Sequence, residues 1–129
     1  MLEAPPEPAN DGTFRIDEER LSPTAIVLML HGEADLHAAP QLRDRLRTAM
    51  DGGATGLVVD LTETSFVDST SLGVLLGALK RQREEGGELR IVVSRPEIRR
   101  IFEITLLDQV FPLHETRADA LASLSSEAR

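Results

Sequence analysis

The chain has 129 residues, 41% of them hydrophobic and 28% charged, which is the balance of a single soluble globular domain. Its net charge of -8 and the lack of a dense Lys/Arg run disfavour direct binding to nucleic acid. There is no Cys and no apolar run long enough to span a bilayer, so we expect a cytoplasmic protein without disulfides, Cys-ligated zinc or membrane insertion.

The N-terminal part predicts a leader and two strands. Residues 1–12 hold three of the seven prolines and scattered acids, a composition that favours a flexible leader. Apolar and polar side chains alternate over residues 13–17, and residues 25–30 form a continuous apolar run. We predict that these two strands pair around Ser22-Pro23 and that the second is buried on both faces.

Helical and strand patterns alternate in the rest of the chain. The predicted helices are marked by apolar residues three and four apart and cover residues 37–51, 72–85, 96–105 and 116–124. Gly or Pro stands at one end of each of the first three. The predicted strands cover residues 56–61, 89–93 and, as a short edge strand, 110–113. The residues after the first of these strands are interpreted as a polar turn.

This order of elements predicts an α/β domain over residues 13–125, with residues 126–129 as a flexible end. We expect a mixed sheet of four to five strands, mostly parallel with βαβ crossovers after an N-terminal antiparallel pair, covered by about four helices. The sequence shows no internal repeat.

Two loops are candidates for the functional site, because sites in such sheets lie beyond the carboxyl ends of parallel strands. They are residues 32–35 and residues 62–71. In the second loop, the local interpretation of Asp68 and Ser69 is helix capping, which contributes typically about 1 kcal/mol. Asp35 has the same capping interpretation, with a partner-facing role as an equal alternative.

Two glycines, Gly73 and Gly77, lie one turn apart in the predicted helix that follows. Glycine inside a helix costs up to about 1 kcal/mol relative to Ala, so each position needs a reason. Close approach of a partner is the functional candidate, and we interpret Gly73 in that way. For Gly77 we favour tight packing of the helix against its own neighbours.

The residues give little support to an enzyme. His31, His37 and His114 are not spaced as metal ligands. We find no Gly-rich phosphate loop followed by Lys, no recognisable Ser/His/Asp arrangement and no paired catalytic acids. We therefore predict no catalytic residue, no metal and no cofactor.

Three segments of the chain share the pattern of one known family. They are GEADLHAAPQL, GLVVDLTETSFVDSTSLGVLLGALKRQREEGGELRIV and RPEIRRIFEITLLDQVF. Together they resemble the STAS domain, the fold of the bacterial anti-sigma factor antagonists. The resemblance extends from about Thr13 to Ser123. Its most specific part is the strand that leads into Ser65–Thr70, followed by Leu72-Gly73.

The resemblance implies a phosphorylation switch. An unphosphorylated antagonist binds an anti-sigma factor that is also an ATP-dependent serine kinase of the histidine-kinase-like ATPase fold, and the sigma factor is displaced. Phosphorylation reverses the binding, and a serine phosphatase resets it. The modified serine corresponds to Ser69, with Thr70 and Ser71 as alternatives, because the family often has Gly where this chain has Ser71.

Physical chemistry is compatible with that position. A phosphate on Ser69 adds roughly -1.5 to -2 charges at a helix N-terminus, where free N–H groups and the helix dipole favour an anion. The same charge opposes burial against a partner. The expected partner-facing residues are Glu33, Asp35, Asp68, Ser69, Thr70, Ser71 and Gly73.

Two alternatives remain open from the sequence. One is a STAS subunit that docks a partner without phosphorylation, either a signalling scaffold or a component of a lipid-transport complex. The other is a small nucleotide-binding or phosphotransfer protein that uses the hydroxyl-rich loop and the helix terminus as an anion site.

Overall fold

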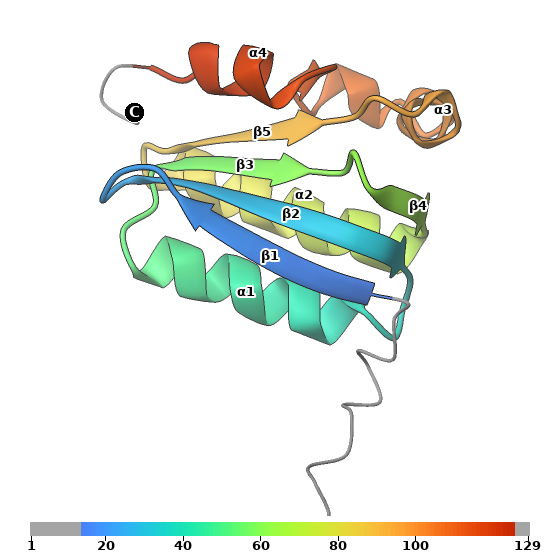
Figure 1. The fold of residues 1–129 in the computed structure, drawn as a ribbon, viewed down its shortest axis with the longest axis horizontal. Coiled ribbons are helices and arrows are strands. Elements are labelled where there is room, and N and C mark those ends of the chain that lie inside the picture. The colour runs from blue at the N-terminus through green and yellow to red at the C-terminus, as the bar shows by residue number, and fades with distance from the viewer. Residues whose placement is uncertain (1–13, 126–129) are drawn as a thin grey trace, which may run out of the picture.

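The computed structural model describes residues 14–125. The six strands are β1 (Phe14–Arg20), β2 (Ala25–Ala34), β3 (Gly56–Asp60), β4 (Thr64–Val67), β5 (Glu88–Val92) and β6 (Leu113–His114) (Figure 1). The four α-helices are α1 (Ala39–Asp51), α2 (Ser69–Glu84), α3 (Pro96–Ile104) and α4 (Arg117–Ala122), and a short 3₁₀ helix covers Leu107–Gln109. The leader and the C-terminal end predicted from the sequence lie outside the described residues.

The strands form one mixed sheet in the order β1-β2-β3-β5-β6. β1 is antiparallel to β2, and the pairs β2–β3, β3–β5 and β5–β6 are all parallel. The predicted α/β class with an N-terminal antiparallel pair is therefore confirmed. The predicted edge strand at residues 110–113 is displaced, because the 3₁₀ helix precedes it and pairing with β5 begins only at Leu113.

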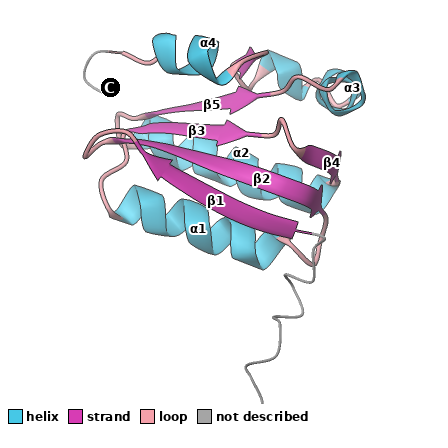
Figure 2. Ribbon diagram, in the orientation of Figure 1, coloured by secondary structure: helices cyan, strands magenta, loops and turns pink. Residues whose placement is uncertain are grey.

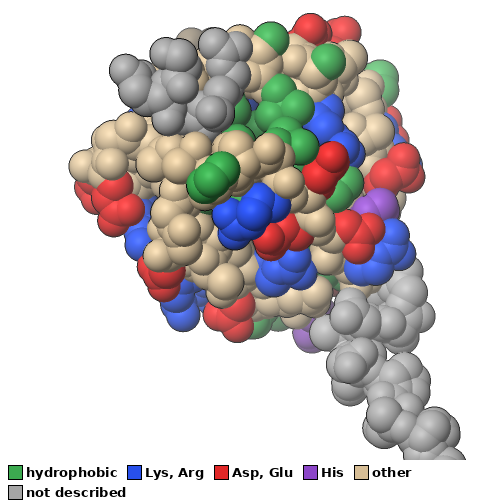
Figure 3. All heavy atoms as spheres, turned by 60° about the vertical axis from the view of Figure 1, so that its left-hand side comes forward, with side chains coloured by type: hydrophobic (Ala, Val, Ile, Leu, Met, Phe, Trp, Pro, Cys, Tyr) green, Lys and Arg blue, Asp and Glu red, His purple; other side chains and the backbone are tan. Residues whose placement is uncertain are grey.

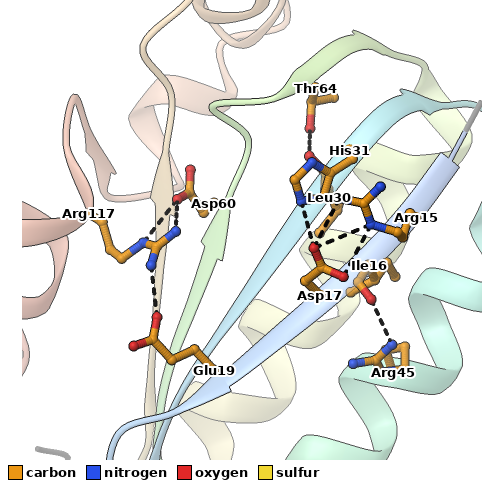
Figure 4. A network of polar contacts seen from close by, with 10 residues as sticks. All are labelled: Arg15, Ile16, Asp17, Glu19, Leu30, His31, Arg45, Asp60, Thr64 and Arg117. Atoms are coloured by element: carbon orange, nitrogen blue, oxygen red, sulfur yellow. Dashed lines mark hydrogen bonds and ion pairs between the residues drawn. The ribbon is translucent and has the colours of Figure 1, made fainter.

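β4 is a strand where the sequence predicted only a polar turn. It pairs in parallel with the carboxyl end of β2, after an irregularity between Gly32 and Glu33. The buried Thr64 hydroxyl donates a hydrogen bond of 2.8 Å to the Leu30 carbonyl, which fixes the start of β4 against β2 (Figure 4). β4 then carries the chain directly to the start of α2.

The sheet buries both of its faces, which explains the continuous apolar runs of its central strands. α1 and α2 lie side by side on one face (Figure 2) and enclose the main core. α4 packs on the other face, where Ala120 and Leu124 meet Val27, Val58 and Val92. The predicted two-sided burial of the second strand is confirmed, since its consecutive side chains from Ala25 to Leu28 are all buried.

A polar network fixes α4 to the sheet. Asp60, at the end of β3, is buried and accepts hydrogen-bonding contacts of 3.2 and 3.1 Å from Nε and Nη2 of Arg117 (Figure 4). Nη1 of Arg117 reaches Glu19 on β1 at 2.9 Å. One guanidinium therefore joins the start of α4 to two strands.

Replacing Arg117 by Ala should lower the free energy of unfolding by about 2 kcal/mol, because it leaves a buried carboxylate without its cation. This figure is below the range for fully buried pairs, since the Arg117 side chain is 37% exposed. Urea denaturation followed by circular dichroism measures it. Arg15→Ala is the matched control, because its ion pair with Asp17 is exposed, and it should cost less than about 0.5 kcal/mol. Equal losses in both variants would contradict the role of Arg117.

Charged side chains of both signs share the surface. On the face shown in Figure 3, acidic and basic groups are interspersed rather than gathered into one large area of a single sign. No helix within residues 14–125 combines the length and apolarity that crossing a membrane requires. Within the same residues, no three His, Asp or Glu side chains are placed to hold a metal ion together.

Candidate functional site

The candidate site lies where β2 and β4 end side by side. The backbone N–H of Asp68 donates to the Ala34 carbonyl at 3.2 Å, so the last residue of β2 is joined to the residue that precedes α2. This contact brings together the two loops that the sequence singled out. Their polar residues therefore form one surface at the carboxyl edge of the sheet.

Asp68 caps α2. Its backbone is extended, and its Oδ1 accepts a 3.0 Å hydrogen bond from the backbone N–H of Ser71. This is the standard arrangement of an N-cap acid, which satisfies one of the free N–H groups at a helix start. The capping role inferred from local sequence is confirmed for Asp68.

Ser69 is the first residue of α2 and is exposed to solvent. Its hydroxyl has no hydrogen-bond partner among residues 14–125. Thr70 and Glu33 are also exposed, while Asp68 and Asp35 are half-buried. The exposed hydroxyls of Ser69 and Thr70 thus stand at the positive end of a 16-residue helix, where an added anion is favoured.

Ser71 differs sharply from its two neighbours. Its side chain is 0% exposed, and its hydroxyl donates to the Asp35 carbonyl at 3.3 Å. The third hydroxyl of the segment is therefore a buried link between the start of α2 and the loop after β2. A kinase or a partner has no access to it in the folded protein.

Asp35 organises the loop before α1. Its Oδ1 accepts hydrogen bonds from the backbone N–H groups of His37 at 3.0 Å and Ala38 at 3.1 Å. Its own carbonyl accepts from Ser71, as described above. Asp35 thus holds the turn that precedes α1, and the prediction that it caps the helix is wrong, because the N-cap of α1 is Ala38, which makes no side-chain capping hydrogen bond. Through its carbonyl, Asp35 is joined to Ser71 at the start of α2.

Gly73 and Gly77 are both exposed, and a Cβ at either would meet nothing within 4 Å. The interpretation of Gly77 as a tight packing position within the chain is therefore wrong. The sequence pattern could not separate the two possibilities, because a glycine facing a neighbouring helix and a glycine facing solvent have the same spacing. Neither glycine is explained by contacts within residues 14–125.

Sequence reasoning missed Phe66. This aromatic side chain lies on β4, two residues before Asp68, and is 44% exposed. A large apolar residue inside a hydroxyl-rich loop was the available signal. An exposed Phe beside the serine adds apolar contact area of the kind that protein interfaces use.

The structure is a small α/β domain with a mixed sheet and with two exposed hydroxyl side chains at the start of α2. Residues 18–120 match the STAS domain family, and the chain belongs to that family. The resemblance inferred from the sequence segments is confirmed.

Named relatives share this sequence and this fold. The anti-sigma-B factor antagonist of Listeria monocytogenes is 33% identical over 94 residues, which are 73% of this chain and 82% of the relative. The crystal structure of an anti-sigma factor antagonist from Mycobacterium paratuberculosis is 27% identical, has a TM-score of 0.80 and covers 92% of this chain and 97% of its own.

The anti-sigma factor antagonist SpoIIAA is similar in two states. Its unphosphorylated form is 26% identical with a TM-score of 0.72, and covers 83% of this chain and 93% of its own. The phosphorylated form, from Bacillus, is 26% identical with a TM-score of 0.65, and covers 85% of this chain and 97% of its own. At least one relative with this fold is thus a phosphoprotein.

Proposed function

We propose that this chain is an anti-sigma factor antagonist that is switched by phosphorylation of Ser69. The observation that carries the proposal is the Ser69 hydroxyl at the first position of α2, which is exposed and has no hydrogen-bond partner within residues 14–125. The names of the relatives support the antagonist role. The phosphorylated form of SpoIIAA supports the switch.

The geometry favours Ser69 over Ser71. The Ser71 hydroxyl is buried and already bonded to the Asp35 carbonyl. Thr70 is exposed, as Ser69 is, so burial does not separate those two. Ser69 is preferred because it directly follows Asp68, which is the position of the modified serine in the family.

The switch requires no change of fold. A phosphate on Ser69 would carry roughly -1.5 to -2 charges beside the free N–H groups of α2, which favour an anion. The partner-facing surface of Glu33, Asp35 and Asp68 already contains carboxylates. The added charge therefore acts on the partner rather than on the domain, since a dianion buried without compensation strongly opposes binding.

The proposed partners follow from this cycle. The unphosphorylated chain binds an anti-sigma factor that is a serine kinase of the histidine-kinase-like ATPase fold, and the sigma factor is released. A serine phosphatase restores the unphosphorylated form. The chain works in the cytoplasm and has no catalytic role of its own.

The direct test is phosphorylation by candidate kinases. Each protein of the histidine-kinase-like ATPase fold encoded in the same genome is incubated with the full chain and ATP, and the product is mapped by mass spectrometry. One phosphate on Ser69, absent from Ser69→Ala, is the expected result. Modification at Ser71 or on no residue would contradict the proposal.

A nucleotide-binding role has less support. A cavity of about 370 Å³ lies between the strand ends and the start of α4, and its lining includes Asp60, Glu63 and Glu115. Its one arginine, Arg117, is already paired with Asp60 and Glu19. An acidic lining with its cation engaged repels a triphosphate.

A non-switching scaffold or lipid-transport subunit predicts a different result. In those roles the chain would dock a partner with the same affinity whether Ser69 is Ala or Glu. The Ser69 variants described in the Discussion therefore also decide between these roles and the switch.

A further inference from the structure

A groove runs between α1 and α2 on the outer side of these helices. It has a volume of about 250 Å³. Its floor includes Gly73 and Gly77, and its walls carry Arg43, Arg47 and Arg81. The lining contains no acidic residue, although the chain as a whole has a net charge of -8.

The glycine floor has no explanation within the described chain. A Cβ at Gly73 or Gly77 would meet no atom within 4 Å, and glycine at each helix-interior position costs up to about 1 kcal/mol relative to Ala. The two glycines are one turn apart and so form a flat strip on α2. Such strips of small residues let another helix approach closely.

The positive charge of the groove is only partly neutralised. Arg43 and Arg47 are exposed and lie one turn apart on α1. Arg43 has no ion pair or hydrogen bond within residues 14–125, and Arg47 has only a loose 3.7 Å contact with Asp44 there. Arg81, by contrast, is held by Asp51 and Glu85. Two cations on α1 are therefore available to a partner.

The groove and Ser69 lie along the same helix, although Ser69 is not part of the groove lining. Ser69, Gly73 and Gly77 follow one another at intervals of four residues along α2, which places them in one row on the helix surface. The row ends at Arg81. A segment lying on the glycine strip would therefore have one end beside the Ser69 hydroxyl.

We infer that this groove docks an acidic amphipathic helix of the anti-sigma factor kinase, with small apolar side chains on the glycine strip and carboxylates facing Arg43 and Arg47. Charge complementarity selects this occupant, because within residues 14–125 Arg43 has no ion pair and Arg47 has only one loose contact, on a protein of net negative charge. The inference rests on the proposed function.

The test measures affinity for the kinase that phosphorylates the chain in the mapping experiment. Calorimetry is performed with the full, unphosphorylated chain and four variants. Arg43→Glu reverses a groove charge, and Arg100→Glu is its control, because Arg100 is an exposed arginine on α3 outside the groove. Gly77→Leu fills the floor, and Thr48→Leu is its control at an exposed position of α1 outside the lining.

We expect Arg43→Glu and Gly77→Leu each to weaken binding by about tenfold or more, and both controls to stay within about twofold of the wild type. Gly77→Leu should also raise the thermal midpoint, because Leu is the better helix former. A loss of affinity in a more stable variant cannot be ascribed to unfolding. Arg43→Glu should in addition reduce the dependence of affinity on salt.

The possible results distinguish a failure of the proposed function from a failure of the groove inference. If the wild type does not bind the kinase, the proposed function fails. If the wild type binds and the groove variants match their controls, the groove inference is overturned while the proposed function stands. Vesicles containing phosphatidylglycerol are measured in parallel. Binding to them that depends on Arg43, without an effect on the kinase, would identify the groove as a membrane contact and overturn the inference.

Discussion

Ser69→Glu is expected to weaken binding to the anti-sigma factor kinase by about 100-fold or more, while Ser69→Ala binds as the wild type does. A 100-fold loss corresponds to about 2.7 kcal/mol, which one uncompensated carboxylate at an interface readily supplies. The side chain at this position is exposed at the start of α2, so the fold accepts either substitution. Calorimetry or surface plasmon resonance with the purified kinase measures the affinities.

The control for Ser69→Glu is Gln109→Glu, which adds the same charge at an exposed position of the 3₁₀ helix. Its affinity should stay within about twofold of the wild type. Thermal unfolding verifies that Ser69→Glu is as stable as the wild type or slightly more so, because an acid in the first turn of a helix is favourable. Equal affinities of the Ser69→Glu and Ser69→Ala variants would show that Ser69 does not contact the kinase.

Ser71→Asp is expected to destabilise the domain by about 4 kcal/mol, a large part of the stability of a typical domain of this size. The residue is 0% exposed, so the new carboxylate is buried, and it faces the Asp35 carbonyl, which is another acceptor. Ser71→Ala loses one hydrogen bond and should cost only about 1 kcal/mol. Urea denaturation of the two variants and the wild type gives both values.

Ser69→Asp is the control that shows whether the loss of stability in Ser71→Asp comes from burial of the new carboxylate. The same carboxylate two residues earlier is exposed and should change the free energy of unfolding by less than about 0.5 kcal/mol. A Ser71→Asp protein as stable as the wild type would mean that Ser71 becomes accessible at little cost. In that case Ser71 would be as good a candidate as Ser69 for the proposed phosphorylation site.

The local features of the site could be predicted because they depend on neighbouring residues. The Asp68 cap follows from an acid placed just before a helical apolar pattern, and Ser69 at the helix start follows from the same signal. The end of α1 could also be predicted, because two glycines follow its apolar pattern. In the structure the second of them, Gly53, adopts a positive φ of 97°, a conformation that favours glycine.

Features that depend on distant residues could not be predicted. β4 exists because its backbone pairs with the end of β2, some thirty residues earlier, and four residues in a hydroxyl-rich segment carry too weak a pattern. The burial of Ser71 depends on the Asp35 carbonyl in the other loop. Leu106 takes a left-handed conformation with φ of 62° that its sequence gives no reason to expect.

The two contacts that join the loops, Asp68 to Ala34 and Ser71 to Asp35, have a consequence for how long a signal lasts. These contacts hold the two loops together, and the proposed switch needs no second conformation of this surface. Whether a molecule is in the binding or the non-binding state then depends only on whether Ser69 carries a phosphate ester. Uncatalysed hydrolysis of phosphate monoesters is among the slowest reactions known. Under this proposal the lifetime of the phosphorylated form would be set by the phosphatase. The fraction of phosphorylated molecules would depend on the relative rates of the kinase and the phosphatase, and not on the rate of a conformational change.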